Sequence, residues 1–150
     1  FNRDKQSIYL SDYYEDPNEK KHYGNLEAEF GNCIIDGKLA TEIYFDRQDE
    51  EQFNYNFDHC VVKLKQSYYN DWNDNIIQSI RLDSDENCGI ANFEQDDFTM
   101  TKTNFYLESQ SVAINSGSGD IVDDDDDLSN DMNNNPRSTK NPDIGCFEKQ

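Results

Sequence analysis

A hexapeptide that occurs twice constrains the fold of this chain more than any other feature. Residues 30–35, with the sequence FGNCII, return as residues 57–62, with the sequence FDHCVV. A weaker copy, NCGI, stands at residues 87–90. The period is about 27 residues, and periods of roughly 20–50 residues are typical of stacked structural units. Each copy is β-branched and too short for a helix, so we expect one strand per turn of a β-solenoid. The repeat therefore predicts an all-β fold, a right-handed parallel β-helix.

The predicted β-helix has a thin apolar interior. We expect successive coils at residues 26–36, 53–65 and 86–93, within coils that span residues 1–110, and an irregular capping tail of the same domain at residues 111–150. Leu, Ile, Val and Phe together account for only 31 of 150 residues. A solenoid folds at such a low apolar content because each coil buries only two or three short strands. The many Asn residues agree with this fold, since Asn tolerates the left-handed conformation of sharp corners.

The segments between the copies give further expectations. Alternating side chains predict a strand at residues 7–14 and another at residues 42–45. The sequence DPNEK at residues 16–20 predicts a loop that leaves the coil stack. Residues 71–80 leave two alternatives open, a short helix and a long loop.

The charge of the chain excludes several partners. Thirteen Lys and Arg residues against 32 Asp and Glu residues give a net charge of -19. Nucleic acid binding requires clustered basic residues, and the few basic residues here are scattered among acids. An anionic membrane surface is disfavoured for the same reason. No apolar stretch reaches the about 18 residues that a membrane-spanning helix needs, so we expect no spanning segment.

The four cysteines contain no Cys-x-x-Cys pair. Cys33, Cys60 and Cys88 hold the same position in the three copies, and Cys146 lies in the tail. Two states are open, a disulfide and an inward stack of free thiols, and we favour the free thiols because stacked cysteines pack as small apolar side chains. His59 beside these cysteines could complete a zinc site, but it takes the place that Asn32 holds in the first copy. We therefore favour a role for His59 as a corner residue.

The tail resembles a known family. The motifs are FYL at residues 105–107 with SVAINSG at residues 111–117, then DMNNNPR at residues 131–137, then PDIGCFE at residues 142–148. They resemble the F-x-L…S-P-A-I-D-A-G, D-x-D-G-x-P-R and P-D-I-G-A-Y-E segments at the end of many secreted parallel β-helix proteins of the pectate-lyase-like superfamily, which are abundant in Bacteroidota. The resemblance implies an extracellular or outer cell-surface location. It implies no activity, because the family mixes lyases, glycan binders and proteins of unknown role.

Exposed aromatic side chains are the main candidates for ligand binding. Aromatic rings beside acids and amides can stack on sugar rings. The alternative is that most of these rings stack laterally between coils. The candidates are Tyr13, Tyr14, Tyr23, Tyr44, Tyr55, Tyr68, Tyr69 and Trp72, of which we single out Tyr68, Tyr69 and Trp72 as ligand-binding candidates.

The acidic run at residues 123–127 raises the possibility of a calcium site. Its candidate ligands are Asp125, Asp127 and Asp131, because hard oxygen ligands suit Ca²⁺. An EF-hand alignment that starts at Asp125 fails, since Asn130 and Pro136 stand where that loop requires Gly and Glu. We favour a solvated acidic loop and expect no bound metal and no other cofactor.

The sequence shows no catalytic constellation. The lyase chemistry of this superfamily needs a base near acidic Ca²⁺ ligands, and no acidic cluster lies in register with Lys63, Lys65 or Arg81. We therefore expect a non-catalytic extracellular solenoid that presents a surface for glycan or cell-surface binding, with polysaccharide as its partner. The alternative is the C-terminal part of a polysaccharide lyase or glycoside hydrolase whose active site lies in coils before Phe1. An open first coil further predicts self-association through residues 1–25, as a two-fold pair.

Overall fold

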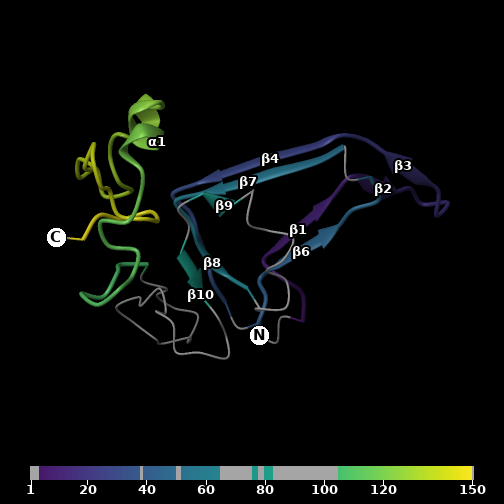
Figure 1. Ribbon diagram of the computed structural model, residues 1–150, viewed down its shortest axis with the longest axis horizontal. Coiled ribbons are helices and arrows are strands. Elements are labelled where there is room, and N and C mark those ends of the chain that lie inside the picture. Colours follow the sequence, from purple (N-terminus) through teal and green to yellow (C-terminus); the bar gives the residue numbers. More distant parts are fainter. Residues whose placement is uncertain are drawn as a thin grey trace.

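A computed structural model describes residues 4–37, 39–49, 52–64, 76–77, 80–82 and 105–149 of the chain. The described strands form four small sheets, each of two or three strands, and the C-terminal tail lies beside them (Figure 1). The strands are β1 (Ile8–Ser11), β2 (Tyr13–Glu15), β3 (Lys21–Tyr23), β4 (Leu26–Gly31), β5 (Ile34–Ile35), β6 (Ile43–Asp46), β7 (Phe53–Asp58), β8 (Val61–Lys63), β9 (Ile76–Ile77) and β10 (Ile80–Leu82).

Three of the sheets are parallel and one is antiparallel. The parallel sheets have the strand orders β4-β7-β9, β10-β8-β5 and β1-β6, and the antiparallel sheet is the hairpin β2-β3. The tail contains a short helix, α1 (Gly119–Asp123), and a 3-10 turn, η3 (Asp126–Leu128). Neither of these helical segments of the described chain is long and apolar enough to cross a membrane.

The two copies of the hexapeptide lie side by side, as the repeat predicted. Phe30 in β4 pairs with Phe57 in β7, and Ile34 in β5 pairs with Val61 in β8, so both pairs keep the spacing of the repeat. The two phenylalanine rings stack with their centroids 4.6 Å apart and an interplanar angle of 11°. The aromatic residues of the two copies therefore form one stack between neighbouring strands.

The prediction of a right-handed parallel β-helix is wrong, because the described strands form small separate sheets, with no solenoid and no closed sheet among them. The spacing of the repeat does not continue. Ile8 of β1 pairs with Ile43 of β6, which is a longer separation, and Val61 of β8 pairs with Ile80 of β10, which is a shorter one. Each strand pairing involves only its own two strands. Two copies of a hexapeptide therefore specify how those two strands pair, but not which strands lie beyond them.

The strands next to the second copy are β9 and β10. They lie in and just after residues 71–80, for which the sequence left a short helix and a long loop open. Residues 86–93, with Cys88, lie outside the described residues.

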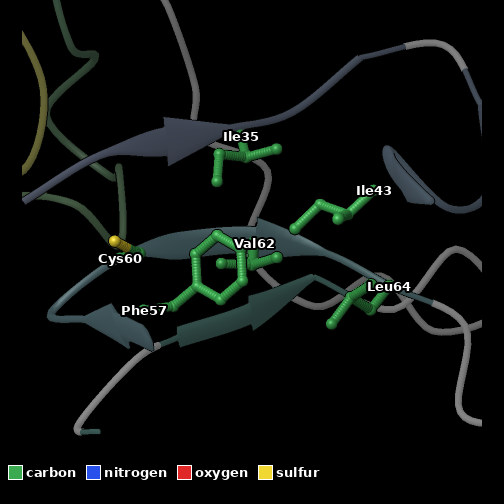
Figure 2. Close-up of a cluster of buried hydrophobic side chains, with 6 residues drawn as sticks. All are labelled: Ile35, Ile43, Phe57, Cys60, Val62 and Leu64. Atoms are coloured by element: carbon green, nitrogen blue, oxygen red, sulfur yellow. The ribbon is translucent and has the colours of Figure 1, made fainter. Parts of the chain in front are cut away.

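The apolar core lies where the three parallel sheets meet. Its buried side chains come from β5, β6, β7 and β8 and the adjoining residues, and Figure 2 shows them facing one another. Phe57 and Cys60 are fully buried, with no exposed surface. Each of these short strands contributes only one or two buried side chains, so the core depends on all of them. The members of the cluster are Ile35, Ile43, Phe57, Cys60, Val62 and Leu64.

The β-branched pairs of the hexapeptide serve two apolar faces. Successive side chains of a strand point to opposite faces. Ile35 and Val62 point into the core, whereas Ile34 and Val61 pack against the tail. Val61 is fully buried because the tail covers that face. This arrangement explains why both residues of each pair are apolar in a chain that is otherwise polar.

The tail lies on the outer face of β5 and β8, at the end of the molecule opposite to the β2-β3 hairpin (Figure 1). Its buried contacts come from Leu107, Ala113 and Ile144. A backbone bond from the amide of Ile144 to the carbonyl of Ala113, 2.8 Å long, joins the SVAINSG motif to the PDIGCFE motif. The apolar residues of these motifs therefore attach the tail to the strands.

Corner residues in the left-handed conformation join the strands, as the sequence predicted. Asn32 and His59 hold equivalent positions and have φ angles of 49° and 48°. The Asn32 side chain also binds the tail, because its Oδ1 accepts a bond from the Ser118 amide at 2.8 Å and its Nδ2 donates to the Ser118 carbonyl at 2.9 Å. Gly117 lies against the same side chain, where a Cβ would approach Asn32 Oδ1 to 2.9 Å. The corner of the first copy is therefore the docking point of the tail.

Candidate functional site

Four tyrosines lie together on the β1-β6 sheet and one face of the β2-β3 hairpin. We call them the tyrosine surface, and its members are Tyr9, Tyr13, Tyr23 and Tyr44. Three of these four were candidates from the sequence, and Tyr9 was missed. The signal for Tyr9 was present, because Ile8 and Leu10 alternate with it and point inward. Of the other candidates, Tyr55 packs against the core, and Tyr68, Tyr69 and Trp72 lie outside the described residues.

Tyr9 and Tyr44 form the centre of the tyrosine surface. They are paired directly across the parallel strands β1 and β6. Their rings stack with centroids 5.4 Å apart and an interplanar angle of 23°. Both point away from the core and are 58% and 44% exposed. An aromatic pair of this kind on a strand face offers a broad apolar surface to solvent.

The hairpin adds a second group of rings. Tyr13 pairs with Tyr23, with ring centroids 6.1 Å apart, and Tyr14 stacks on His22 at 4.9 Å. Tyr14 and Tyr23 are 64% and 63% exposed, but Tyr14 and His22 lie on the opposite face of the hairpin from Tyr13 and Tyr23, because successive side chains of a strand point to opposite faces. The turn is held by Asp16, whose Oδ1 accepts bonds from the amides of residues 18 and 20 at 2.9 and 3.0 Å. The predicted loop at residues 16–20 is therefore the turn of this hairpin.

Lys21 lies over one ring of the hairpin, that of Tyr13. The Nζ of Lys21 is 4.1 Å from the centroid of the Tyr13 ring, a cation–π geometry, and 3.8 Å from the Glu15 carboxylate. Lys21 and Glu15 are partners across the antiparallel strands. The ammonium group of Lys21 therefore interacts with Tyr13 and Glu15 of the same hairpin.

Asp46 joins the sheet to the hairpin. Its Oδ2 accepts a hydrogen bond from the Tyr13 hydroxyl at 2.6 Å and another from the Tyr9 hydroxyl. Both bonds lower the pKa of Asp46, and the bond from Tyr13 has the larger effect. The same bonds raise the pKa of Tyr13 and of Tyr9. Asp46 is therefore ionised at neutral pH and both phenols keep their protons. One carboxylate fixes the direction of two rings.

A buried carboxylate supports this arrangement. Asp12 is 4% exposed and accepts bonds from the amides of Gln48 at 2.9 and 3.0 Å and of Asp49 at 2.7 Å. These bonds hold the segment after β6 against the segment that joins β1 to β2. Because Asp46 ends β6, the Asp12 contacts also restrict where the Asp46 carboxylate can lie.

The tyrosine surface has the chemistry of a binding site. Exposed tyrosine rings present apolar faces, and the hydroxyl and carboxylate groups between them donate and accept hydrogen bonds. This combination suits a ligand that has an apolar face with hydroxyl groups around its rim. No group of three or more His, Cys, Asp or Glu side chains in the described parts of the chain is placed to hold a metal ion.

The candidate calcium ligands do not lie in one cluster. Asp125 and Asp127 are exposed, and the Asp125 carboxylate accepts a bond from the Asp127 amide at 3.0 Å, as the N-cap of η3. Asp131 is buried, and its carboxylate accepts bonds from the amides of Asn133 and Asn135 at 2.8 Å and from that of Glu148 at 3.1 Å. The carboxylate of Asp131 therefore organises the tail.

The other polar residues of the tail motifs also have structural partners. Arg137 donates to Glu148 Oε1 at 3.0 Å and to the carbonyl of Gly145 at 2.7 Å. Burial raises the pKa of Glu148. Asp143 accepts bonds from the amides of Asn115 at 2.7 Å and Lys149 at 2.6 Å. Sequence reasoning identified the motifs but not these contacts, which close the tail on itself.

Among the described residues no His and Cys side chains are grouped as a zinc site, and Cys88 lies outside them. The Nδ1 of His59 lies 2.6 Å from the carboxylate of Asp58, its neighbour in sequence. Cys33, Cys60 and Cys146 are free thiols. His59 therefore acts at the corner, and the carboxylate beside it orients its ring.

Comparisons with known proteins find no relative. No protein-family model matches the chain, and no curated protein and no solved structure matches it. The resemblance of the tail motifs to the pectate-lyase-like superfamily stays a prediction.

Proposed function

We propose that this protein is a non-catalytic glycan-binding protein that acts outside the cell or at its surface, and that the tyrosine surface is its binding site. The observation that carries the proposal is the outward-facing stack of Tyr9 and Tyr44, flanked by Tyr13 and the exposed Tyr23. Sugar rings have apolar faces and hydroxyl rims, so they match rings that are separated by polar groups. The extracellular location rests on the tail motifs.

The charges at this surface favour a neutral glycan. Glu15 and Asp46 are carboxylates beside these rings, and Lys21 is held by Glu15 and the Tyr13 ring. The whole chain carries a net charge of -19. A polyuronate would bring one more carboxylate per residue, and like charges repel each other across a few ångströms of partly screened solvent. We therefore expect neutral hexose polymers to bind and polyuronates to be rejected.

Glycan binding can be tested by affinity electrophoresis and calorimetry. The probes are hydroxyethyl cellulose and soluble galactomannan as neutral polymers, and polygalacturonate as the acidic one. We expect at least one neutral polymer to bind. Tyr44→Ala should weaken binding by about tenfold or more, because a central aromatic contact is worth about 1.4 kcal/mol or more.

Two matched variants control this experiment. Tyr9→Phe keeps the stacking ring and should bind with an affinity close to that of the unmodified protein, whereas Tyr9→Ala should bind as weakly as Tyr44→Ala. Phe105→Ala removes an aromatic ring that is 47% exposed on the tail, and it should leave binding unchanged. Binding only to polygalacturonate would refute the neutral ligand, and absence of binding to all three polymers would refute the site.

We also propose that the protein self-associates through its N-terminal segment. Within residues 1–25, β1 is paired along one edge only among the described strands, and an unpaired edge can add a strand from a second copy. The net charge of -19 opposes this contact, so association should increase with salt. Light scattering at micromolar concentration checks the prediction, and a monomer of 17.5 kDa at both low and high salt would contradict it.

A further inference from the structure

The cysteines of the two hexapeptide copies hold corresponding positions in two neighbouring connections, Cys33 between β4 and β5 and Cys60 between β7 and β8. The pairs on either side of them, Gly31 with Asp58 and Ile34 with Val61, have the same sequence separation as Cys33 and Cys60. A backbone hydrogen bond joins the two segments at these cysteines, because the Val61 amide donates to the Cys33 carbonyl at 2.8 Å. Equivalent Cα atoms of adjacent strands lie about 4.8 Å apart. Disulfides join Cα atoms that are roughly 4.4–6.8 Å apart, so this spacing suits a bridge.

The two thiols differ in their access to solvent. Cys60 is fully buried, and its Sγ lies 3.3 Å from the carbonyl oxygens of Phe30 and Asp58. Cys33 is half-buried, with its Sγ 3.1 Å from the carbonyl of Gly31. A small reagent can therefore reach Cys33 first, and Cys60 lies behind it.

The two thiols also interact with each other. A hydrogen bond from the Cys60 thiol lowers the pKa of Cys33, and the same bond raises the pKa of Cys60. The half-buried sulfur is thus the better nucleophile and the buried sulfur keeps its proton. This division of roles is the one that a reactive cysteine and a resolving cysteine require.

We propose that Cys33 and Cys60 form a peroxide-sensitive dithiol, which converts to a reversible disulfide between the two hexapeptide copies. In the first step the Cys33 thiolate attacks hydrogen peroxide, the O–O bond breaks, and Cys33 becomes a sulfenic acid while hydroxide leaves and takes a proton to form water. In the second step the Cys60 sulfur attacks the sulfenic sulfur, the S–O bond breaks, and the proton of Cys60 leaves with the hydroxyl as a second water. Two thiols are oxidised, and one peroxide is reduced.

Cys146 provides an internal control. It lies in the tail, half-buried, and burial raises its pKa. It has no counterpart in either hexapeptide. Peroxide at low excess should therefore leave Cys146 as a thiol.

The test uses the whole protein, reduced and then treated with hydrogen peroxide. Intact mass should fall by about 2 Da as two hydrogens are lost, and the loss should reverse with dithiothreitol. Peptide mapping after alkylation of the remaining thiols should show Cys33 linked to Cys60. The oxidised protein should melt several degrees higher than the reduced protein, because the bridge restricts the unfolded chain.

Three variants separate the proposal from other outcomes. Cys146→Ala should form the bridge at an unchanged rate. Cys33→Ala should lose the change in mass, and Cys60→Ala should accumulate sulfenic or sulfinic acid at Cys33, which dimedone labelling detects. A bridge from Cys60 to Cys88 or Cys146, oxidation of Cys33 without a bridge in the unmodified protein, or no reaction at all would each overturn the proposal. The mapping of the unmodified protein decides these outcomes even if a variant fails to fold.

Discussion

Replacement of Phe57 by alanine should lower the free energy of unfolding by about 3–5 kcal/mol. The ring has no exposed surface and stacks on Phe30 at 4.6 Å. Its removal loses the transfer free energy of a buried aromatic side chain and leaves a cavity between β4, β7 and the other core strands. Urea denaturation followed by circular dichroism measures the effect. A change this large is a substantial part of the roughly 5–15 kcal/mol that is typical of a folded domain.

Two variants control the Phe57 experiment. Phe105→Ala deletes the same side chain at a position that is 47% exposed, and we expect a loss below about 1 kcal/mol there. Phe57→Leu keeps most of the volume and should have an intermediate effect. A Phe57→Ala protein as stable as Phe105→Ala would show that β4 and β7 do not form the core.

Replacement of Arg137 by methionine should detach the tail, at a cost of about 3–5 kcal/mol, because it leaves the partner charge buried without compensation. The Arg137 and Glu148 side chains are only 9% and 14% exposed. The guanidinium also donates to the carbonyls of Asp143 at 3.3 Å and of Gly145 at 2.7 Å, and methionine satisfies neither. Hydrogen exchange should show faster exchange of the amide of Ile144, whose bond to Ala113 holds the tail together.

A double variant separates the charge from the other contacts of Arg137. Arg137→Met with Glu148→Gln removes both charges, so it should recover part of the loss, and the recovered part measures the penalty of the unpaired carboxylate. Lys140→Met is the surface control, because Lys140 is exposed in the same tail. An effect of Arg137→Met no larger than that of Lys140→Met would mean that the tail motifs do not hold the tail in place.

The candidate site was predictable from the sequence only in part. The sequence singled out Tyr68, Tyr69 and Trp72 as ligand-binding candidates, and these lie outside the described residues. Three other aromatic candidates, Tyr13, Tyr23 and Tyr44, lie together with Tyr9. The link from Tyr13 to Asp46 was not predictable, because it joins the ends of strands that are far apart in sequence. Tyr9 was missed for the opposite reason, since its signal is the short alternation Ile8-Tyr9-Leu10 and needs no distant contact.

The sequence by itself determined the local features of this protein. The repeat predicted the register of β4 on β7 and of β5 on β8, because equal side chains stack best when neighbouring strands align. It also predicted the left-handed corners at Asn32 and His59, since that conformation depends on the residue and its immediate neighbours.

Only the tertiary structure decided how these local units combine. The β-helix prediction failed because strand pairing beyond the two copies, β1 with β6 and β8 with β10, follows separations that no repeated motif specifies. The place of the tail depends on the face of Ile34 and Val61, and a sequence cannot show which partner covers an apolar face. Local conformation depends on neighbouring residues, so the sequence pattern reveals it. Burial depends on segments that are far apart in sequence and meet only in the folded protein.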